Sequence, residues 1–170
     1  YKVTFPLTAQ TGINTARLTD EDANGGNTDA TDSDVDSDAS ETNGMTETYI
    51  LSSGENEVRA DAGYYVPASI GDFVWNDTNG NGIQDALEPG IGGVTVTLTG
   101  TTGDGTPVTL TTTTAPDGSY IFENLEPGTY KVTFSTPAGL QPVEADQGGD
   151  DTKDSDAGAG GMTPNEVLTT

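Results

Sequence analysis

The chain has 170 residues, with 28 Asp and Glu against five Lys and Arg, a formal net charge of −23, and neither His nor Cys. The absence of His and Cys excludes disulfides, thiolate or imidazole metal sites, and Ser-His or Cys-His catalytic pairs. The acidic balance argues against nucleic acid and anionic lipid surfaces as partners and favours cations. No apolar run approaches the roughly 18 residues of a membrane-spanning helix, so no membrane insertion is expected.

An internal repeat organises the chain. Residues 1–5 (YKVTF) recur as residues 130–134 at an offset of 129, and residues 44–46 (GMT) recur as residues 161–163 at an offset of 117. The smaller second offset makes the second copy shorter across the intervening acidic loop, where insertions and deletions are tolerated. The chain therefore contains parts of two tandem repeats.

The repeat predicts two domains. Residues 1–67 are interpreted as the C-terminal part of one repeat and residues 68–170 as the following repeat. The second copy is expected to lack its final strand, because it has no counterpart of residues 57–65. The open sheet edge that results would invite strand exchange with an adjacent chain. The alternative is that the 170 residues are a window from a longer tandem array.

The first acidic segment, residues 20–38, contains eight acidic residues. Asp32, Asp34 and Asp36 alternate within it, so their carboxylates could wrap around a calcium ion. A solvated acidic loop is the alternative interpretation.

Residues 77–88 (DTNGNGIQDALE) match the twelve-residue calcium loop of EF-hands. Oxygen-only ligands suit a hard cation, and Gly82 at the sixth position permits the sharp turn. The alternative is an Asn/Gly-rich turn that only resembles this pattern. The predicted ligands are the side chains of five residues and one backbone carbonyl: Asp77, Asn79, Asn81, Asp85 and Glu88, with the carbonyl of Ile83.

The flanks of this loop are not those of an EF-hand. Residues 70–75 have the pattern of a strand, and Pro89 and Gly90 prevent a helix after the loop. The calcium loop is therefore expected on a β-domain, without the helix opening of calcium sensors.

Short alternating strands follow. Residues 93–98, 108–113, 119–122 and 129–134 alternate with period two, and turn sequences rich in Gly, Pro and Asp separate them. This spacing predicts an all-β fold, an antiparallel β-sandwich. The aromatic residues on these patterns are the predicted core: Phe73, Trp75, Tyr120, Phe122, Tyr130 and Phe134.

The last acidic segment, residues 144–156, contains six acidic residues. Asp150, Asp151, Asp154 and Asp156 are candidate ligands for further calcium ions, with a solvated loop again as the alternative.

Several motifs in order resemble the SdrD B-like repeat, a calcium-binding relative of the CnaB domain in bacterial surface adhesins. They include residues 69–75 (SIGDFVW), the calcium loop, residues 117–122 (DGSYIF), residues 125–130 (LEPGTY) and residues 154–156 (DSD). The resemblance implies a prealbumin-like or immunoglobulin-like sandwich, an extracellular location at the cell surface, and several calcium ions per repeat. Many CnaB relatives carry a Lys–Asn isopeptide bond, but residues 70–75 have no lysine, so none is expected.

These features predict a calcium-stiffened structural repeat of an extracellular bacterial surface protein, a stalk, spacer or filament module of an adhesin. Its expected partners are neighbouring repeats of the same array. The alternative is a ligand-binding or carbohydrate-binding adhesin module, whose mark would be exposed aromatic side chains on one loop face. An enzyme is not expected, because no cleft-building segment accompanies the paired carboxylates.

Overall fold

The computed structural model describes residues 2–11, 14–18, 45, 49–54, 60, 62–150, 152–158 and 160–168. The chain separates into two compact units, Tyr1–Pro67 and Ala68–Thr169. All regular elements in the described residues are β-strands, and every strand pair is antiparallel. No helix long and apolar enough to cross a membrane occurs in these ranges.

The first unit contains a three-stranded sheet of order β1-β2-β3. Its strands are β1 (Thr8–Thr11), β2 (Asn14–Leu18) and β3 (Tyr64–Tyr65). The Tyr64 hydroxyl donates a 2.6 Å hydrogen bond to the carbonyl of Pro6, which ties β3 to the chain segment before β1.

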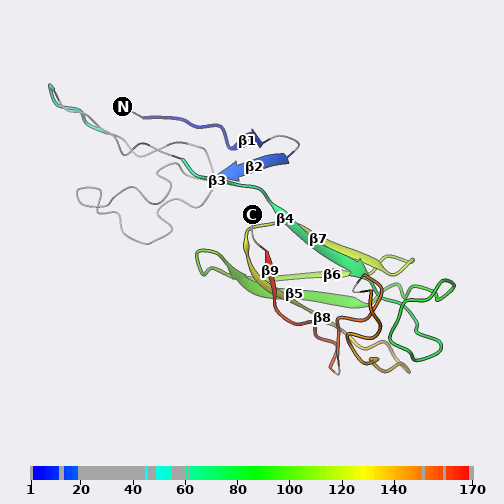
Figure 1. Ribbon diagram of the computed structural model, residues 1–170. Coiled ribbons are helices and arrows are strands. Elements are labelled where there is room, and N and C mark those ends of the chain that lie inside the picture. Colours follow the sequence, from blue (N-terminus) through cyan, green and yellow to red (C-terminus); the bar gives the residue numbers. More distant parts are fainter. Residues whose placement is uncertain are drawn as a thin grey trace. The chain divides into compact units, whose positions relative to one another are not determined.

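The second unit has a two-stranded sheet, β4-β7, and a four-stranded sheet of order β6-β5-β8-β9 (Figure 1). Five of these strands, β4 to β8, overlap the segments that the sequence predicts as strands. The bounds of all six are β4 (Ala68–Phe73), β5 (Thr95–Thr102), β6 (Pro107–Thr113), β7 (Ser119–Leu125), β8 (Gly128–Phe134) and β9 (Glu166–Leu168).

One cluster of buried side chains joins the two sheets. Val96 and Leu98 of β5 are fully buried, and they pack with side chains of β7 and β8: Phe122, Leu125, Tyr130 and Val132. Because neighbouring residues of a strand face opposite sides, polar residues alternate with these apolar residues, threonines along β5 and threonines with Lys131 along β8. The antiparallel β-sandwich predicted from the sequence is thus the fold of this unit.

The aromatic residues only partly follow the core prediction. Phe122 and Tyr130 are buried, and Tyr120 and Phe134 pack against the cluster at its border. The prediction is wrong for Phe73 and Trp75, which are half-buried and lie outside the cluster. The reason is that β4 ends at Phe73, and the chain there leaves the sheet for the loop that follows.

The two units share one structural detail that mirrors the sequence repeat. Thr4 forms an isolated antiparallel bridge with Met45 in the first unit, and Thr133 forms one with Met162 in the second. These pairs occupy equivalent positions of the two sequence copies. The interpretation of residues 1–67 as the tail of a preceding repeat stays a prediction, which this similarity supports.

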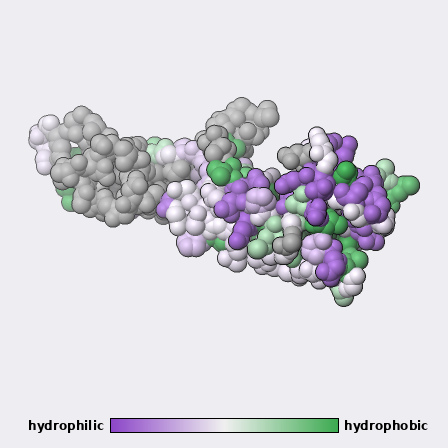
Figure 2. Space-filling model, turned by 60° about the horizontal axis from the view of Figure 1, so that its bottom comes forward, coloured by the Kyte–Doolittle hydropathy of each residue, from purple (hydrophilic) through white to green (hydrophobic). Residues whose placement is uncertain are grey.

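The face of the molecule in Figure 2 shows hydrophobic residues scattered among hydrophilic ones. Exposed hydrophobic side chains such as Ile121 and Val167 are ordinary on protein surfaces when they occur singly. The candidate functional residues of the second unit are therefore those of its loops.

Leu98 and Leu110 provide a matched test of the core. They are register partners on β5 and β6, but Leu98 is fully buried while Leu110 is 41% exposed. We expect Leu98→Ala to lower the free energy of unfolding by about 2–5 kcal/mol, because it removes buried apolar area and leaves a cavity. Leu110→Ala is expected to cost much less. Urea unfolding at fixed calcium concentration measures both, and equal losses would contradict this core.

Candidate metal centre

The predicted calcium loop, residues 77–88, is closed at its base by strand-like pairing. Asn76 N–H donates to the carbonyl of Pro89 at 2.9 Å, and Ile91 N–H donates to the carbonyl of Val74 at 2.7 Å. Gly90 is required here, because a Cβ at that position would overlap the carbonyl of Asp117. The two ends of the loop are therefore held together by the body of the sandwich.

Asp77 organises the first half of the loop. Its Oδ1 accepts hydrogen bonds from the N–H groups of Asn79 at 3.2 Å and Gly80 at 2.6 Å, and its Oδ2 accepts one from Gly82 at 2.7 Å. Partial desolvation alone would raise the pKa of Asp77, but the backbone N–H groups outweigh it and hold the pKa below its usual value. Asp77 is thus kept ionised inside a turn of the chain.

Three predicted ligands converge on one point. The Nδ2 groups of Asn79 and Asn81 both donate to Oδ2 of Asp85, at 2.8 and 3.0 Å. An asparagine amide carries its oxygen and nitrogen on the same planar group, so a rotation about its last bond exchanges them. The loop therefore brings two amide groups and a carboxylate within reach of a shared cation.

Glu88 connects the two ends of the loop. Its Oε1 accepts hydrogen bonds from the N–H of Thr78 at 2.8 Å and from the hydroxyl of Thr78 at 3.1 Å, while its Oε2 accepts one from Asp85 N–H at 3.2 Å. Both carboxylate oxygens thus face the interior of the loop, as a ligand at the twelfth position must.

The middle of the loop pairs with the last acidic segment, a contact that no sequence pattern predicts. The carbonyl of Gly82 accepts a 3.1 Å hydrogen bond from Ser155 N–H, and Gln84 N–H donates to the carbonyl of Lys153 at 2.6 Å. These bonds flank an antiparallel bridge between Ile83 and Asp154. They also fix the peptide whose carbonyl is the predicted backbone ligand.

Gly82 is packed at this junction. Its φ is 76°, and a Cβ there would lie 2.7 Å from Cγ of Gln147 and 2.9 Å from the carbonyl oxygen of Glu144. Glycine is needed both for the backbone conformation and for the close approach of the last acidic segment.

The carboxylates of the last acidic segment differ in environment. Asp150 is exposed and forms a 3.1 Å ion pair with Lys153 as well as a 2.7 Å hydrogen bond from the Thr152 hydroxyl. Asp154 is half-buried, and its Oδ1 is buried without a hydrogen-bond partner in the described part of the chain. A buried carboxylate oxygen without a donor is costly, so a cation would be favourable there.

Asp156 and Asp72 lie close to Tyr120. Burial, and then the charges of Asp72 and Asp156, raise the pKa of the Tyr120 hydroxyl well above its usual value. Desolvation also raises the pKa of Asp72, although a backbone hydrogen bond at Phe73 opposes the shift. Two carboxylates from β4 and the last acidic segment therefore border the same partly dry region.

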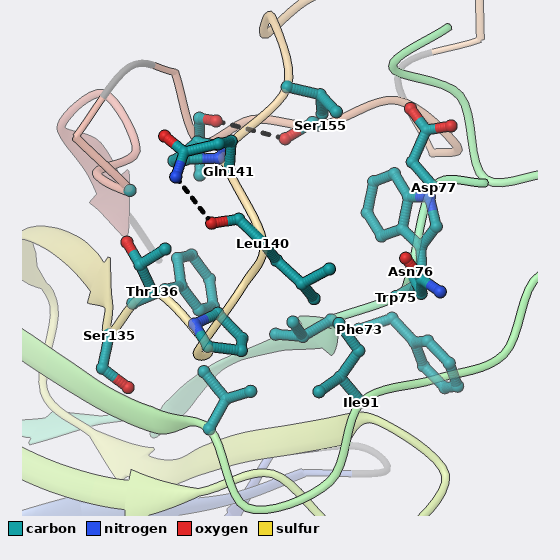
Figure 3. A pocket seen from close by; sticks show the side chains of 18 of the residues that line it. Phe73, Trp75, Asn76, Asp77, Ile91, Ser135, Thr136, Leu140, Gln141 and Ser155 are labelled. Atoms are coloured by element: carbon teal, nitrogen blue, oxygen red, sulfur yellow. Dashed lines mark hydrogen bonds between the residues drawn. The ribbon is translucent and has the colours of Figure 1, made fainter. Parts of the chain in front are cut away.

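These residues border a cavity of about 300 Å³ beside the candidate centre. Trp75 and Leu140 approach it from opposite walls, and Ile91 and Phe73 lie nearby (Figure 3). Trp75 Nε1 is buried and has no hydrogen-bond partner in the described residues. Asp77 and Ser155 lie at the edge of this cavity, so the cavity and the calcium loop share a wall.

The structure thus separates the predicted ligands by position. The ligands of residues 77–88 lie together in one loop, with Asp154 beside them. No cluster of three or more acidic side chains suited to a metal forms in the described ranges. The donor set therefore depends on amide and carbonyl oxygens as well as carboxylates, which fits calcium. The remaining candidates, Asp32, Asp34, Asp36 and Asp151, lie outside the described residues.

The SdrD B-like domain family matches residues 68–170. The chain belongs to this family. It is 44% identical over 129 residues, 75% of its length, to serine-aspartate repeat-containing protein D of Staphylococcus aureus (strain Newman). It is 43% identical over 118 residues, 68% of its length, to serine-aspartate repeat-containing protein F of Staphylococcus epidermidis (strain ATCC 12228 / FDA PCI 1200). It spans only 9% and 7% of the length of these two relatives.

Gly82 and Gly80 test the junction between the loop and the last acidic segment. Both have positive φ, 76° and 74°, but a Cβ at Gly80 would meet nothing within 4 Å. We expect Ala at either position to cost about 1–2 kcal/mol of backbone strain. Gly82→Ala is expected to cost roughly 1–3 kcal/mol more, because it crowds Glu144 and Gln147. Thermal unfolding measures the difference, and equal losses would show that this close approach is absent.

Proposed function

We propose that this SdrD B-like domain is a calcium-stiffened structural repeat of an extracellular bacterial surface protein, a stalk, spacer or filament module. The observation that carries the proposal is the loop of residues 77–88, which presents oxygen donors to one region and pairs through its backbone with residues 153–155. A ligand that orders this loop would also order the long connection between β8 and β9.

The loop residues fit calcium by their chemistry. Asp77, Asn79, Asn81, Asp85 and Glu88, with the carbonyl of Ile83, would hold the ion. A bound calcium ion supplies the positive charge that the chain lacks, since acidic residues outnumber basic ones 28 to five. Asp77 and Glu88 already have their carboxylates fixed by backbone N–H groups, so little side-chain entropy would be lost on binding.

Additional calcium ions are proposed at the other acidic segments. Asp154 is the best supported ligand of these, because its buried Oδ1 has no donor in the described residues. Asp156 is a second candidate. Asp150 would have to leave its ion pair with Lys153. Asp151 and the first-repeat residues Asp32, Asp34 and Asp36 lie outside the described residues, so calcium binding by them stays a prediction.

The surface location rests on family membership and on the relatives, both named as serine-aspartate repeat-containing proteins of staphylococci. Binding sites with dissociation constants of roughly 10⁻⁴–10⁻³ M would be occupied in extracellular settings. Neighbouring repeats of the same array are the proposed partners, as the repeated sequence at residues 1–67 suggests. Strand exchange with an adjacent chain stays a prediction.

Calcium titration tests the leading proposal. At a calcium concentration about 100 times Kd, binding to the folded state alone adds about 2.7 kcal/mol of stability. A chelator is therefore expected to lower the Tm by roughly 10 °C. In calorimetric titration, Glu88→Ala is expected to weaken or abolish one binding event, because it removes the ligand that closes the loop.

Glu123→Ala is the matched control. Glu123 is an exposed carboxylate on β7, away from the loop sequence, so its removal makes the same change of charge. Calcium binding should be unchanged in this variant. The proposal is wrong if the chelator leaves the Tm of the parent chain unchanged, or if both variants bind calcium as the parent chain does.

A second function, a ligand-binding adhesin module, is favoured by the cavity beside the loop. Its volume of about 300 Å³ lies at the lower end of small-molecule sites, and Trp75, Tyr120 and Phe134 line it. Aromatic side chains offer a ligand a large apolar contact area.

Trp75 is the only tryptophan of the sequence, so its fluorescence reports on this cavity. If the cavity binds a carbohydrate, titration with oligosaccharides at fixed calcium concentration should shift or quench the emission saturably. Leu140→Phe, which fills part of the cavity from the opposite wall without adding a second tryptophan, should weaken the response of Trp75. Unchanged emission across a panel of sugars would argue against this function.

A further inference from the structure

The outer edge of β6 is an unpaired strand edge in the described structure. β6 is the last strand of the sheet order β6-β5-β8-β9, and no other described strand pairs with it on the side away from β5. Thr109, Thr111 and Thr113 are exposed along this edge. Exposed edges of this length are ready templates for pairing with another strand.

The register of β5 and β6 shows which backbone groups are free. Beyond the two ends of β6, Thr102 N–H donates to the carbonyl of Thr106 at 3.0 Å, and Thr114 N–H donates to the carbonyl of Val94 at 3.0 Å. Residues of an antiparallel pair alternate between bonding toward the partner and away from it. The even-numbered residues of β6 therefore bond to β5, and Thr109, Thr111 and Thr113 direct their N–H and C=O groups outward.

The charge pattern identifies the partner. Residues 105–116 contain no charged side chain, although the whole chain carries −23. Natural edge strands are usually protected by charged residues, prolines or bulges. β6 has only Pro107 at its start, and its register with β5 is regular throughout. A second copy of β6 can approach this edge without bringing carboxylates against carboxylates.

The other strand edges are less suitable for self-pairing. In the second unit, β9 is only three residues long and begins with Glu166, β4 carries Asp72, and β7 carries Glu123. In two copies of any of these strands, like charges would be brought close together at the contact, which is unfavourable.

We propose that β6 pairs antiparallel with β6 of a second copy of this chain, about a twofold axis at Thr111. Thr111 then faces Thr111, and Thr109 faces Thr113, so each outward N–H meets a carbonyl. Threonine pairs across antiparallel strands are favourable. The pairing joins two four-stranded sheets edge to edge, and it would link neighbouring surface stalks side by side. It is independent of the proposed calcium site.

Sedimentation of the full chain at fixed calcium concentration tests this pairing. The average mass is expected to rise from 17.4 kDa toward twice that value with concentration and to stop there, because a twofold pair leaves no free β6 edge. A mass that stays at the monomer at every concentration would overturn the proposal. A mass that continues past the dimer would also overturn it, since donated strands form open chains.

Variants at Thr111 locate the contact. Thr111→Pro removes an outward N–H that β5 does not use, so we expect at least a tenfold weaker association with the fold retained by circular dichroism. Thr111→Val keeps the N–H and the β-branch and should associate like the parent chain.

Thr111→Lys provides a second test that does not depend on proline being tolerated. It places two positive charges opposite each other on the axis, so association should be weaker than that of the parent chain, and high salt should strengthen it more than it strengthens association of the parent chain. Unchanged association of both the proline and the lysine variants would show that another surface forms the dimer.

Discussion

The backbone pairing of residues 82–84 with residues 153–155 is the constraint on which the loop end of this domain depends. The calcium loop consists mostly of small polar residues and can bury little apolar area of its own. Its base is tied to the sandwich, and among the described residues its middle bonds to the last acidic segment where Gly82 and Gln84 pair with Ser155 and Lys153. The carbonyl of Ser155 in turn accepts a 3.0 Å hydrogen bond from Asp146 N–H, so this loop and the last acidic segment form one connected structure.

This connection explains how a domain with so few basic residues tolerates its acids. Asp77 and Glu88 are compensated by backbone N–H groups, and Asp150 by Lys153 and Thr152. Hydrogen bonds of this kind satisfy individual carboxylates but do not change the net charge of −23. Repulsion among the acids therefore remains as a force that opens the loops. At neutral pH, cations from solution can neutralise it, which is the physical basis for the proposed structural role of calcium.

The sequence predicted the features that depend on local patterns. Alternation of apolar and polar residues places β5 and β8, because it is set by residues close in the chain. Side-chain spacing likewise places the candidate ligands of residues 77–88 in one loop, and calcium binding there stays a prediction. The pairing of Ile83 with Asp154 joins distant segments that have no shared pattern, so no local signal could reveal it. For the same reason Asp150 and Asp154 looked equivalent, although one forms an exposed ion pair and the other has a buried oxygen without a donor.

The cavity lies beside the hydrophobic core, at the loop end of the sandwich. The buried cluster comes from β5, β7 and β8, whereas the long connection between β8 and β9 contributes no member to it. Several hydrogen bonds tie that connection to the domain: among them, Ser155 bonds to the loop of residues 77–88, and the carbonyl of Gly161 accepts a 2.7 Å hydrogen bond from Phe134 N–H at the end of β8. The cavity lies between these attachments, with Leu140 on one side and Trp75 on the other. The hydrophobic core therefore fixes the strands. The position of the cavity wall formed by the β8–β9 connection depends instead on its bonds to the loop of residues 77–88. Any interaction that stabilises this loop therefore also stabilises that end of the sandwich.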